Sequence, residues 1–228
     1  MPDKFTDERW KAVDSYLTET LFETDAVLDA AMDANAAAGL PPIDVTATQG
    51  QFLQLLARLV GARRILEIGT LGGYSTIWLG RMLPEDGQLV TLEFDPHHAA
   101  VARANLARAG LSQVVELRLG PAAETLERMV EAGEGAFDII FIDADKENNA
   151  VYLEWALKLA RVGTLIVCDN VIRDGEVANA KSTDPAIVGT QAMLARMAAE
   201  PRLVATALQT VGSKGYDGFA LGLVVQSD

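Results

Sequence analysis

Residues 64–75 read RILEIGTLGGYS, and this stretch decides the fold. Its first part, 64–68, is a short and largely apolar run, and a loop with three glycines follows at once. Short apolar runs bounded by glycine are typical of strands, and a run without strict polar alternation indicates a strand covered on both faces. A helical pattern begins at Ser75. We therefore predict a buried strand, a tight glycine turn and a helix.

The same unit recurs along the chain. Strands are predicted at 64–68, 88–92, 114–119, 137–142 and 164–168. Helices are predicted between them at 75–83, 97–109, 122–132 and 147–160. Strands that alternate with helices of this length form a parallel sheet with helices on both faces. The sequence therefore predicts an α/β protein.

The flanking regions have different patterns. Helices are predicted at 5–22, 24–38 and 47–60, and the sequence GLPP at 39–42 ends the second of them. These three helices form a predicted N-terminal extension, residues 1–60.

After the fifth strand, residues 170–184 are polar, and a helix is predicted at 185–199. The runs 202–210 and 217–225 are predicted to form a final antiparallel pair. Their connector is expected to contain Gly212, Gly215 and Gly218.

Composition limits the domain count, the location and the partners. The sequence shows no repeat and no linker, so we interpret residues 1–228 as a single domain, with the sheet in 61–228. A single cysteine, Cys168, excludes a multi-cysteine zinc site. With no apolar leader and no membrane-length apolar run, the chain is expected to be cytoplasmic. The net charge is −13 without a Lys/Arg cluster, which argues against nucleic-acid and membrane partners.

The glycine loop and the next strand end predict a nucleoside ligand. Leu71 stands where a dinucleotide fingerprint would have its second glycine, so a pyrophosphate site is not indicated. Glu93 ends the second strand, where an acidic residue can accept the hydroxyls of a ribose. The alternative is that Glu93 is only a helix cap or a solvated charge.

Polar residues end the fourth and fifth strands and predict a metal site. Asp143 follows the fourth strand, and Asp169 and Asn170 follow the fifth. If the first, fourth and fifth strands are neighbours, these oxygens meet at one edge and suit a hard divalent cation. Lys146, about one helical turn beyond Asp143, could serve as a base. The alternatives are helix capping by the acids and a plain salt bridge for the lysine.

These residues together resemble the cation-dependent class I O-methyltransferases that use S-adenosylmethionine, a family that includes catechol and caffeoyl-CoA methyltransferases. The resemblance runs from about residue 40 to the C-terminus and rests on LEIGT at 66–70, GGYS at 72–75, FIDADK at 141–146 and DN at 169–170. It implies a doubly wound, Rossmann-like sheet of seven mostly parallel strands with an antiparallel last strand. It also implies a homodimer.

The resemblance assigns roles to individual residues. Lys146 would be the general base, and Asp143, Asp169 and Asn170 would bind the metal, with Mg²⁺ expected and Mn²⁺ or Ca²⁺ possible alternatives. The implied contacts of S-adenosylmethionine are Val45, Glu67, Gly69, Thr70, Ser75, Glu93, Ala122, Asp143 and Asp145. Asp174 is expected to contact the acceptor, although Arg173-Asp174 stands where the plant CoA-ester enzymes tend to have Trp-Asn.

The predicted activity is metal-dependent methylation of a hydroxyl on a small phenolic acceptor with two adjacent hydroxyls. A CoA ester is disfavoured because residues 1–45 hold three basic and ten acidic residues, and 170–184 adds only Arg173 and Lys181 as basic ones. Two alternatives stay open. One is a catalytically silent S-adenosylmethionine-binding protein. The other is an NAD-dependent oxidoreductase, disfavoured by the missing glycine and by the lack of a Tyr-x-x-x-Lys pair.

Overall fold

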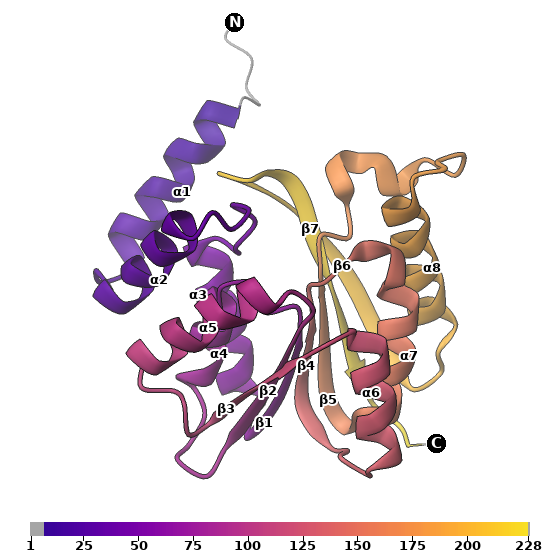
Figure 1. Cartoon of the computed structure of the whole chain (residues 1–228). Helices are drawn as coiled ribbons and strands as arrows, with labels where there is room; N and C mark the ends of the chain where they lie inside the picture. Colours follow the sequence, from indigo (N-terminus) through magenta and orange to yellow (C-terminus); the bar gives the residue numbers. More distant parts are fainter. Residues whose placement is uncertain (1–6, 228) are drawn as a thin grey trace, which may run out of the picture.

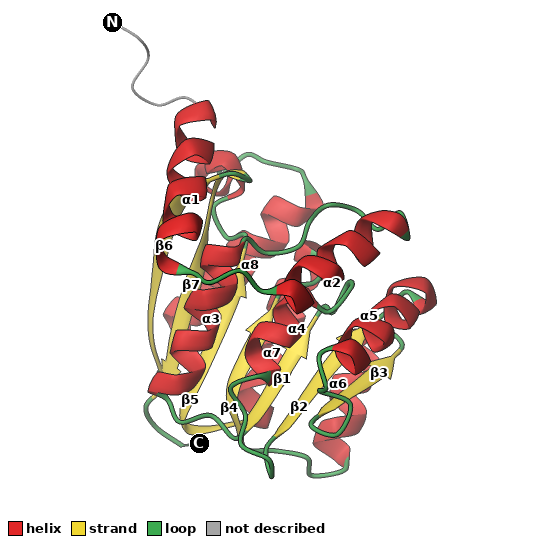
Figure 2. Cartoon of the chain, turned by 90° about the vertical axis from the view of Figure 1, so that its left-hand side faces the viewer, coloured by secondary structure: helices red, strands yellow, loops and turns green. Residues whose placement is uncertain are grey.

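The computed structural model describes residues 7–227, and a seven-stranded sheet forms its centre. The strand order is β3-β2-β1-β4-β5-β7-β6, and Figure 2 shows the strands side by side. Six strands share one direction, and β7 is antiparallel to both of its neighbours. The strands are β1 (Arg64–Ile68), β2 (Gln88–Glu93), β3 (Val115–Leu119), β4 (Phe137–Ile142), β5 (Ala160–Asp169), β6 (Leu203–Gly212) and β7 (Gly215–Val224). The predicted doubly wound, mostly parallel sheet is therefore confirmed.

Helices cover both faces of this sheet. Figure 1 shows α3, α4 and α5 on one side and α6, α7 and α8 on the other. The helices are α1 (Asp7–Leu21), α2 (Ala26–Ala37), α3 (Ala47–Leu59), α4 (Tyr74–Gly80), α5 (Pro96–Arg108), α6 (Ala122–Glu131), α7 (Asn149–Leu159) and α8 (Pro185–Ala199). Two short 3₁₀ segments are η1 (Lys146–Asn148) and η2 (Arg173–Ala178). Residues 5 and 6 of the first predicted helix lie outside the described residues.

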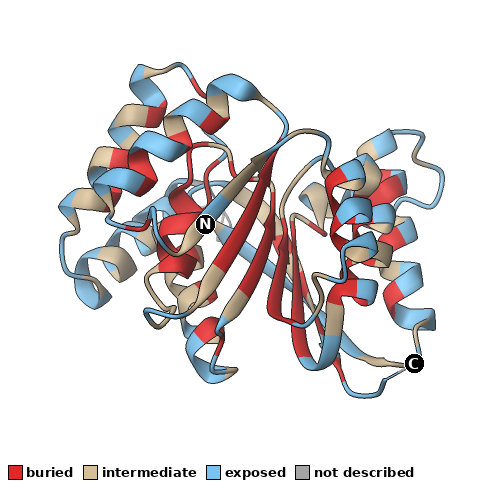
Figure 3. Ribbon diagram, turned by 60° about the horizontal axis from the view of Figure 1, so that its bottom comes forward, coloured by how far each residue is buried: buried red, intermediate tan, exposed pale blue. Residues whose placement is uncertain are grey.

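Alternate side chains of each central strand enter two different cores. In β1, Ile65 packs with the core under α2–α5, whereas Leu66 packs with the core under α6–α8. In β4, Ile139 and Ile140 divide in the same way. Successive strand residues point to opposite faces, so a sheet covered on both sides needs apolar residues at every position. Figure 3 shows the buried strands between helices whose outer faces are exposed.

Local capping fixes where several helices begin. The Asp95 carboxylate accepts hydrogen bonds from the backbone N–H groups of His97 and His98, and Pro96 occupies the first turn of α5. Thr46 caps α3 through the N–H of Gln49. Each such cap contributes about 1 kcal/mol. These caps hold the start of α5 and of α3 beside the carboxyl ends of the strands.

Three details differ from the expectations. Strand β5 begins at Ala160, directly after α7, because Ala160 pairs with Phe137 before a register irregularity. Gly218 lies inside β7, and the connector after Gly212 is only residues 213–214. A side chain at Gly218 would come within 2.1 Å of the Leu208 carbonyl oxygen, so this glycine permits close strand contact and does not mark a loop.

The order of the strands decides where a site can form. Strand β1 lies between β2 and β4, and β4 lies next to β5. The carboxyl ends of these parallel strands therefore meet at one edge of the sheet, as the metal-site prediction requires. Within residues 7–227, no helix combines the length and apolar character needed to cross a membrane.

Candidate active site

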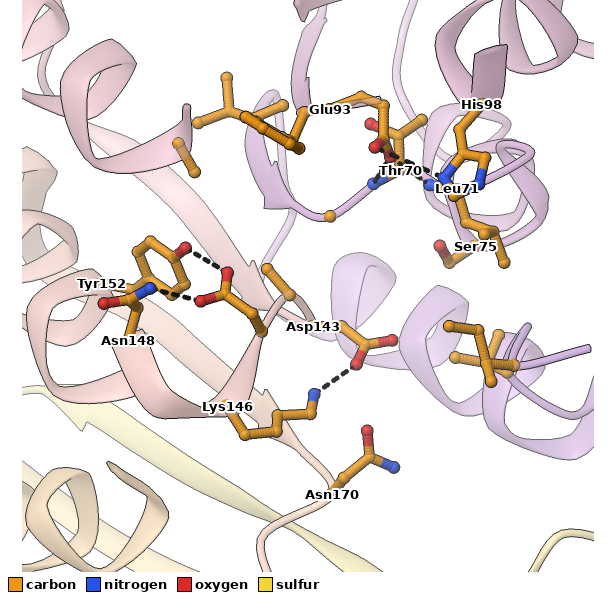
Figure 4. A pocket seen from close by; sticks show the side chains of 18 of the residues that line it. Thr70, Leu71, Ser75, Glu93, His98, Asp143, Lys146, Asn148, Tyr152 and Asn170 are labelled. Carbon is orange, nitrogen blue, oxygen red and sulfur yellow. Dashed lines mark hydrogen bonds and ion pairs between the residues drawn. The ribbon is translucent and has the colours of Figure 1, made fainter. Parts of the chain in front are cut away.

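A cavity of about 740 Å³ opens at this edge of the sheet. Figure 4 shows its side chains, with Glu93 and Thr70 on one side and Lys146 and Asn170 on the other. It is lined by most of the predicted site residues: Val45, Gly69, Thr70, Ser75, Glu93, Ala122, Asp143, Asp145, Lys146 and Asn170. Side chains separated by up to 125 positions in the sequence thus share one site.

Gly69 is required by the backbone at the end of β1. Its φ of +100° lies in the left-handed region, which glycine adopts without penalty. A Cβ at this position would stand 2.2 Å from the backbone oxygen of Asp143. The chain after β1 can therefore pass directly over the end of β4 only with glycine here.

Glu93 organises the glycine loop from the end of β2. One carboxylate oxygen, Oε2, accepts hydrogen bonds from the N–H groups of Leu71 at 2.7 Å and Thr70 at 3.3 Å. The other, Oε1, accepts from the N–H of Asp95 at 2.9 Å and lies 3.6 Å from Nδ1 of His98. Glu93 is mostly buried, yet it lines the cavity. It therefore joins the loop to the place where a ribose is expected.

Glu67 lies beneath the loop and does not line the cavity. Its carboxylate is fully buried and accepts hydrogen bonds from the hydroxyls of Ser75 at 2.6 Å, Thr76 at 2.5 Å and Thr91 at 2.7 Å. Burial raises its pKa to about 7, although the three hydroxyl donors act in the opposite direction. Glu67 thus ties β1, β2 and α4 together under the cavity floor.

Lys146 and Asp143 form an ion pair inside the cavity. The Lys146 Nζ atom lies 2.7 Å from Oδ1 of Asp143, and Figure 4 shows Asn170 beside this pair. Only 10% of the lysine side chain and 20% of the aspartate side chain are exposed. The predicted juxtaposition of a carboxylate and a lysine is therefore present, in an environment with little water.

Asp169 and Asn170 continue the polar cluster at the end of β5. Asp169 is buried, and its carboxylate accepts hydrogen bonds from Gln49 Nε2 at 2.6 Å and from the Asn170 N–H at 2.8 Å. Burial, together with the nearby Asp143 carboxylate, raises the pKa of Asp169. Asn170 has a φ of +56°, and it lines the cavity.

Gln49 joins this cluster from the N-terminal extension, and no pattern in the sequence predicts its role. It lies in the first turn of α3, 120 positions away from Asp169. Only the packing of α3 against the sheet brings the amide to the carboxylate. A lone glutamine in a helix carries no pattern that would identify such a contact.

The Asp145 carboxylate is held by two side-chain donors, one from η1 and one from α7. The Tyr152 hydroxyl donates to one of its oxygens at 2.5 Å, and the Asn148 amide donates to the other. Burial, and then the contact with Asp145, raise the pKa of Tyr152 above its usual range. The phenol thus stays protonated and acts as a donor, which fixes the carboxylate at the cavity wall.

A buried asparagine network supports the glycine loop from behind and was also missed. Asn105 Nδ2 donates to the Gly72 carbonyl at 2.8 Å and to Asn35 Oδ1 at 3.0 Å. Asn35 Nδ2 in turn donates to Asp44 Oδ1 at 2.8 Å. Because Asp44 lines the cavity next to Val45, the network connects α2 and α5 to both the loop and the cavity wall.

The expected acceptor contact, Asp174, lies differently from the other candidates. It is exposed and does not line the cavity, whereas its neighbour Arg173 does. Both residues have a φ of +55°, and Gly175 follows with +88°. The Asp217 carboxylate on β7 accepts hydrogen bonds from the N–H groups of Ile172 and Arg173, each at 3.0 Å, and so holds this turn.

The donor set at the strand ends fits a hard divalent cation. Asp143, Asp169 and Asn170 offer two carboxylates and an amide oxygen, the ligand types that Mg²⁺ and Mn²⁺ prefer. Among residues 7–227, no three or more His, Cys, Asp or Glu side chains are grouped as a metal centre. Of the three candidate ligands, Asp143 and Asn170 line the cavity, whereas Asp169 is buried and does not.

Comparisons with known proteins agree with this geometry. Residues 18–222 match the O-methyltransferase family. A protein named catechol O-methyltransferase from Niastella koreensis is 53% identical over 216 residues, which cover 94% of this chain and 97% of that protein. A protein of the same name from Mycobacterium tuberculosis is 55% identical over 93% of this chain and 94% of its own.

A solved structure of an O-methyltransferase from Bacillus cereus in complex with SAH superposes with a TM-score of 0.95. It is 54% identical, and the alignment covers 96% of this chain and 100% of that one. The family match includes every predicted site residue from Val45 to Asp174. The oxidoreductase alternative gains no support from these relatives. The chain belongs to the O-methyltransferase family and is an enzyme that uses S-adenosylmethionine.

Proposed function

We propose that this enzyme methylates one hydroxyl of a small aromatic acceptor with two adjacent hydroxyls, with the help of a divalent cation. The observation that carries the proposal is the cluster of Asp143, Lys146 and Asn170 on one side of the cavity, across from Glu93. The catechol O-methyltransferases of Niastella koreensis and Mycobacterium tuberculosis, each more than half identical, support the acceptor class.

Five residues are proposed to hold the cofactor through groups that line the cavity. Glu93 would accept the ribose hydroxyls, and Ala122 would lie beside the adenine. Thr70, Ser75 and Asp145 would face the methionine end, with the Asp145 carboxylate near its ammonium group. The cofactor supplies a methyl group on a positively charged sulfur, so the protein's task is to position the acceptor oxygen and remove its proton.

Asp143, Asp169 and Asn170 are proposed to hold the cation. A bound divalent cation would fix two adjacent acceptor oxygens and lower the pKa of the phenol. Asp143 lies close enough to Asp169 for its carboxylate to raise the pKa of Asp169. Negative charge is therefore concentrated where β4 and β5 end. The donor set and this charge support a cation as the neutralising partner.

Lys146 is the proposed general base. Its Nζ atom lies in the cavity beside Asp143, which holds the amine toward the acceptor site. The mostly buried setting keeps water from competing for the acceptor proton. Lys146 would take that proton as a neutral amine while the acceptor oxygen attacks the methyl group and the bond from that methyl group to the cofactor sulfur breaks.

The test is a methylation assay with labelled S-adenosylmethionine and catechol, run with EDTA and after readdition of Mg²⁺ or Mn²⁺. We expect turnover only with the cation. Full turnover in metal-free enzyme would mean that the acids are structural. Binding of the cofactor without methylation of any dihydroxy aromatic would overturn the proposed acceptor class. A higher kcat/KM for caffeoyl-CoA than for free catechols would overturn the small-acceptor proposal.

A homodimer is also proposed. The edge strand β6 exposes Val204, Leu208 and Val211, each with more than half of its surface accessible. Long exposed edge strands with apolar side chains tend to be covered by another chain. Light scattering should give twice the 24.4 kDa of one chain, and a mass of 24.4 kDa at micromolar concentration would refute the dimer. The cytoplasmic location and the absence of nucleic-acid or membrane partners stay predictions.

A further inference from the structure

Arg173 is an unpaired cation in the cavity wall. It lines the cavity, its Nε atom is shielded from solvent, and within residues 7–227 that atom has no hydrogen-bond partner. Buried polar groups are nearly always hydrogen-bonded, because an unpaired one costs free energy. A guanidinium presents its N–H groups as a planar fork that matches a carboxylate. No hydrogen bond or ion pair joins the Arg173 guanidinium to another group among residues 7–227, so its donors point to an anionic ligand from the cavity.

The charges around Arg173 make this unusual. The other cation in the cavity wall, Lys146, is paired with Asp143, and the wall also contains the carboxylates of Asp44, Glu93, Asp145 and Glu147. Asp145 is bound by Tyr152 and Asn148, and Glu93 by the glycine loop. The chain has a net charge of −13, yet no carboxylate of residues 7–227 pairs with this cavity cation.

The position of Arg173 separates it from the cofactor side. It follows β5 by four residues, and its backbone is tied to β7 through Asp217. The proposed ribose contact, Glu93, ends β2, and two strands, β1 and β4, lie between β2 and β5. Arg173 therefore belongs to the same side of the cavity as Asn170, where the acceptor is proposed to bind.

We propose that Arg173 binds a carboxylate on the acceptor, so that the enzyme prefers acidic catechols, aromatic rings with two adjacent hydroxyls and a carboxylate substituent. This inference rests on the proposed function and narrows its substrate class. The carboxylate supplies acceptor oxygens for the N–H donors of the guanidinium. A neutral catechol leaves these donors unpaired, and a cationic catechol amine is repelled.

A matched pair of acceptors tests the proposal. The probes are 3,4-dihydroxybenzoate and its neutral analogue 3,4-dihydroxybenzamide, with dopamine as the cationic probe. The wild-type enzyme should show a kcat/KM for the benzoate about 10- to 100-fold above that for the benzamide, the range for a hydrogen bond to a charged group. Dopamine should rank last.

Variants of Arg173 test whether this residue causes the preference for the benzoate over the benzamide. Arg173→Gln should reduce the benzoate-to-benzamide ratio to about one, because the loss falls on the charged acceptor. Arg173→Lys keeps the charge and should retain part of the ratio. Lys181→Gln removes the same charge from an exposed position outside the cavity and should leave the ratio unchanged. Calorimetry with S-adenosylmethionine should give the same affinity in Arg173→Gln as in the wild type.

Each outcome decides a separate point. An unchanged ratio in Arg173→Gln, or a wild-type ratio near one, overturns the carboxylate contact while catechol methylation stands. A loss of cofactor affinity in Arg173→Gln would place the arginine on the cofactor instead. Equal losses for benzoate and benzamide would show a structural role. Methylation of none of the three probes would overturn the proposed acceptor class, and the inference with it.

Discussion

The two sides of the cavity are built differently. On the cofactor side, Glu67 and Glu93 accept six hydrogen bonds, three from hydroxyls on α4 and β2 and three from backbone N–H groups of the connecting loops. On the acceptor side, Asn170, Arg173 and Asp174 all have a positive φ within five residues of chain. Among the described residues, Arg173 is the only one that lines the cavity and also has a buried side-chain atom without a partner.

The hydrogen bonds on the cofactor side and the unsatisfied groups on the acceptor side suggest different effects of ligand binding on the two sides. A preorganised cofactor side loses little conformational freedom when the cofactor binds. The acceptor side keeps unsatisfied donors and concentrated negative charge, which a cation and the acceptor are proposed to satisfy. Substitutions should therefore have different effects on the two sides. Changes near β5 and β7 should alter kcat and the acceptor KM. Changes under the glycine loop should alter the affinity for S-adenosylmethionine and the free energy of unfolding.

The largest effect is expected from Lys146→Met. Loss of a general base lowers kcat by about 100- to 10,000-fold. The affinity for S-adenosylmethionine should change little, because the Lys146 amine pairs with Asp143 and not with the glycine loop. Stopped assays for kcat and calorimetry for the cofactor measure the two quantities. Lys181→Met is the exposed control, and an equal loss of cofactor affinity in Lys146→Met would contradict the division between the two sides.

A smaller effect concerns the buried carboxylate of the cofactor side. Burial raises the pKa of Glu67 from 4.5 to about 7. Between these values the folded chain keeps a proton that the unfolded chain has lost, so stability falls as the pH rises from 4.5 to 7 and then levels off. The lost free energy of unfolding is about 3 kcal/mol. Glu67→Gln cannot titrate and should lack this part of the pH dependence.

Urea unfolding of the wild type and of Glu67→Gln at pH 5 and pH 8 measures this difference, since the other titrating groups cancel between the two chains. Glu124→Gln, an exposed change on α6, is the control and should follow the wild type. Parallel curves for the wild type and Glu67→Gln would show that Glu67 stays ionised when folded.

The sheet could be predicted from the sequence because its central strands are buried on both faces. Such strands are apolar at nearly every position, and β4 has the predicted boundaries of 137–142. Strand boundaries were predicted wrongly where the residues are no longer continuously apolar. The first residues of β5 after Ala160 are exposed and polar in part, so they do not look like a strand. The expected place of Gly218 in the connector is wrong, because this glycine lies inside β7 and allows β6 to approach.

The third prediction concerns the asparagine network behind the glycine loop. Asn105→Ala removes the donor to Gly72 and Asn35 and leaves two buried acceptors unpaired. The expected cost is about 1 to 3 kcal/mol in the free energy of unfolding. The KM for S-adenosylmethionine should rise, while the acceptor KM should stay near the wild-type value. Gln113→Ala, which removes an exposed amide, is the control. A raised acceptor KM alone would contradict this placement.

Part of the candidate site was predictable because several of its residues stand at the ends of predicted strands. Asp143, Lys146, Asp169 and Asn170 stand at strand ends, and topology alone brings strand ends together. Gln49 and Asn105 come from helices far away in the sequence, and their partners depend on helix packing that no local pattern encodes. The sequence predicts no cavity position for the Arg173 side chain, since the turn that lets it line the cavity is held by Asp217, 44 positions later. The single-domain division and the role of Asp174 stay predictions.

The smallest effect is expected from Asp217→Asn on the acceptor side. One Asp217 oxygen accepts hydrogen bonds from the N–H groups of Ile172, Arg173 and Gly218. An amide oxygen can accept the same bonds but is a weaker acceptor than a carboxylate, so the turn should loosen by about 1 kcal/mol. The acceptor KM should rise about fivefold, which is what 1 kcal/mol corresponds to. Cofactor affinity should stay constant, because Glu93 and the glycine loop do not contact this turn through any hydrogen bond between described residues. Steady-state kinetics with 3,4-dihydroxybenzoate and calorimetry with S-adenosylmethionine measure both quantities, with Asp33→Asn on the exposed face of α2 as the control. If Asp217→Asn lowered the affinity for the cofactor as much as that for the acceptor, the turn would support the binding of both ligands. The proposed difference between the two sides of the cavity would then be wrong.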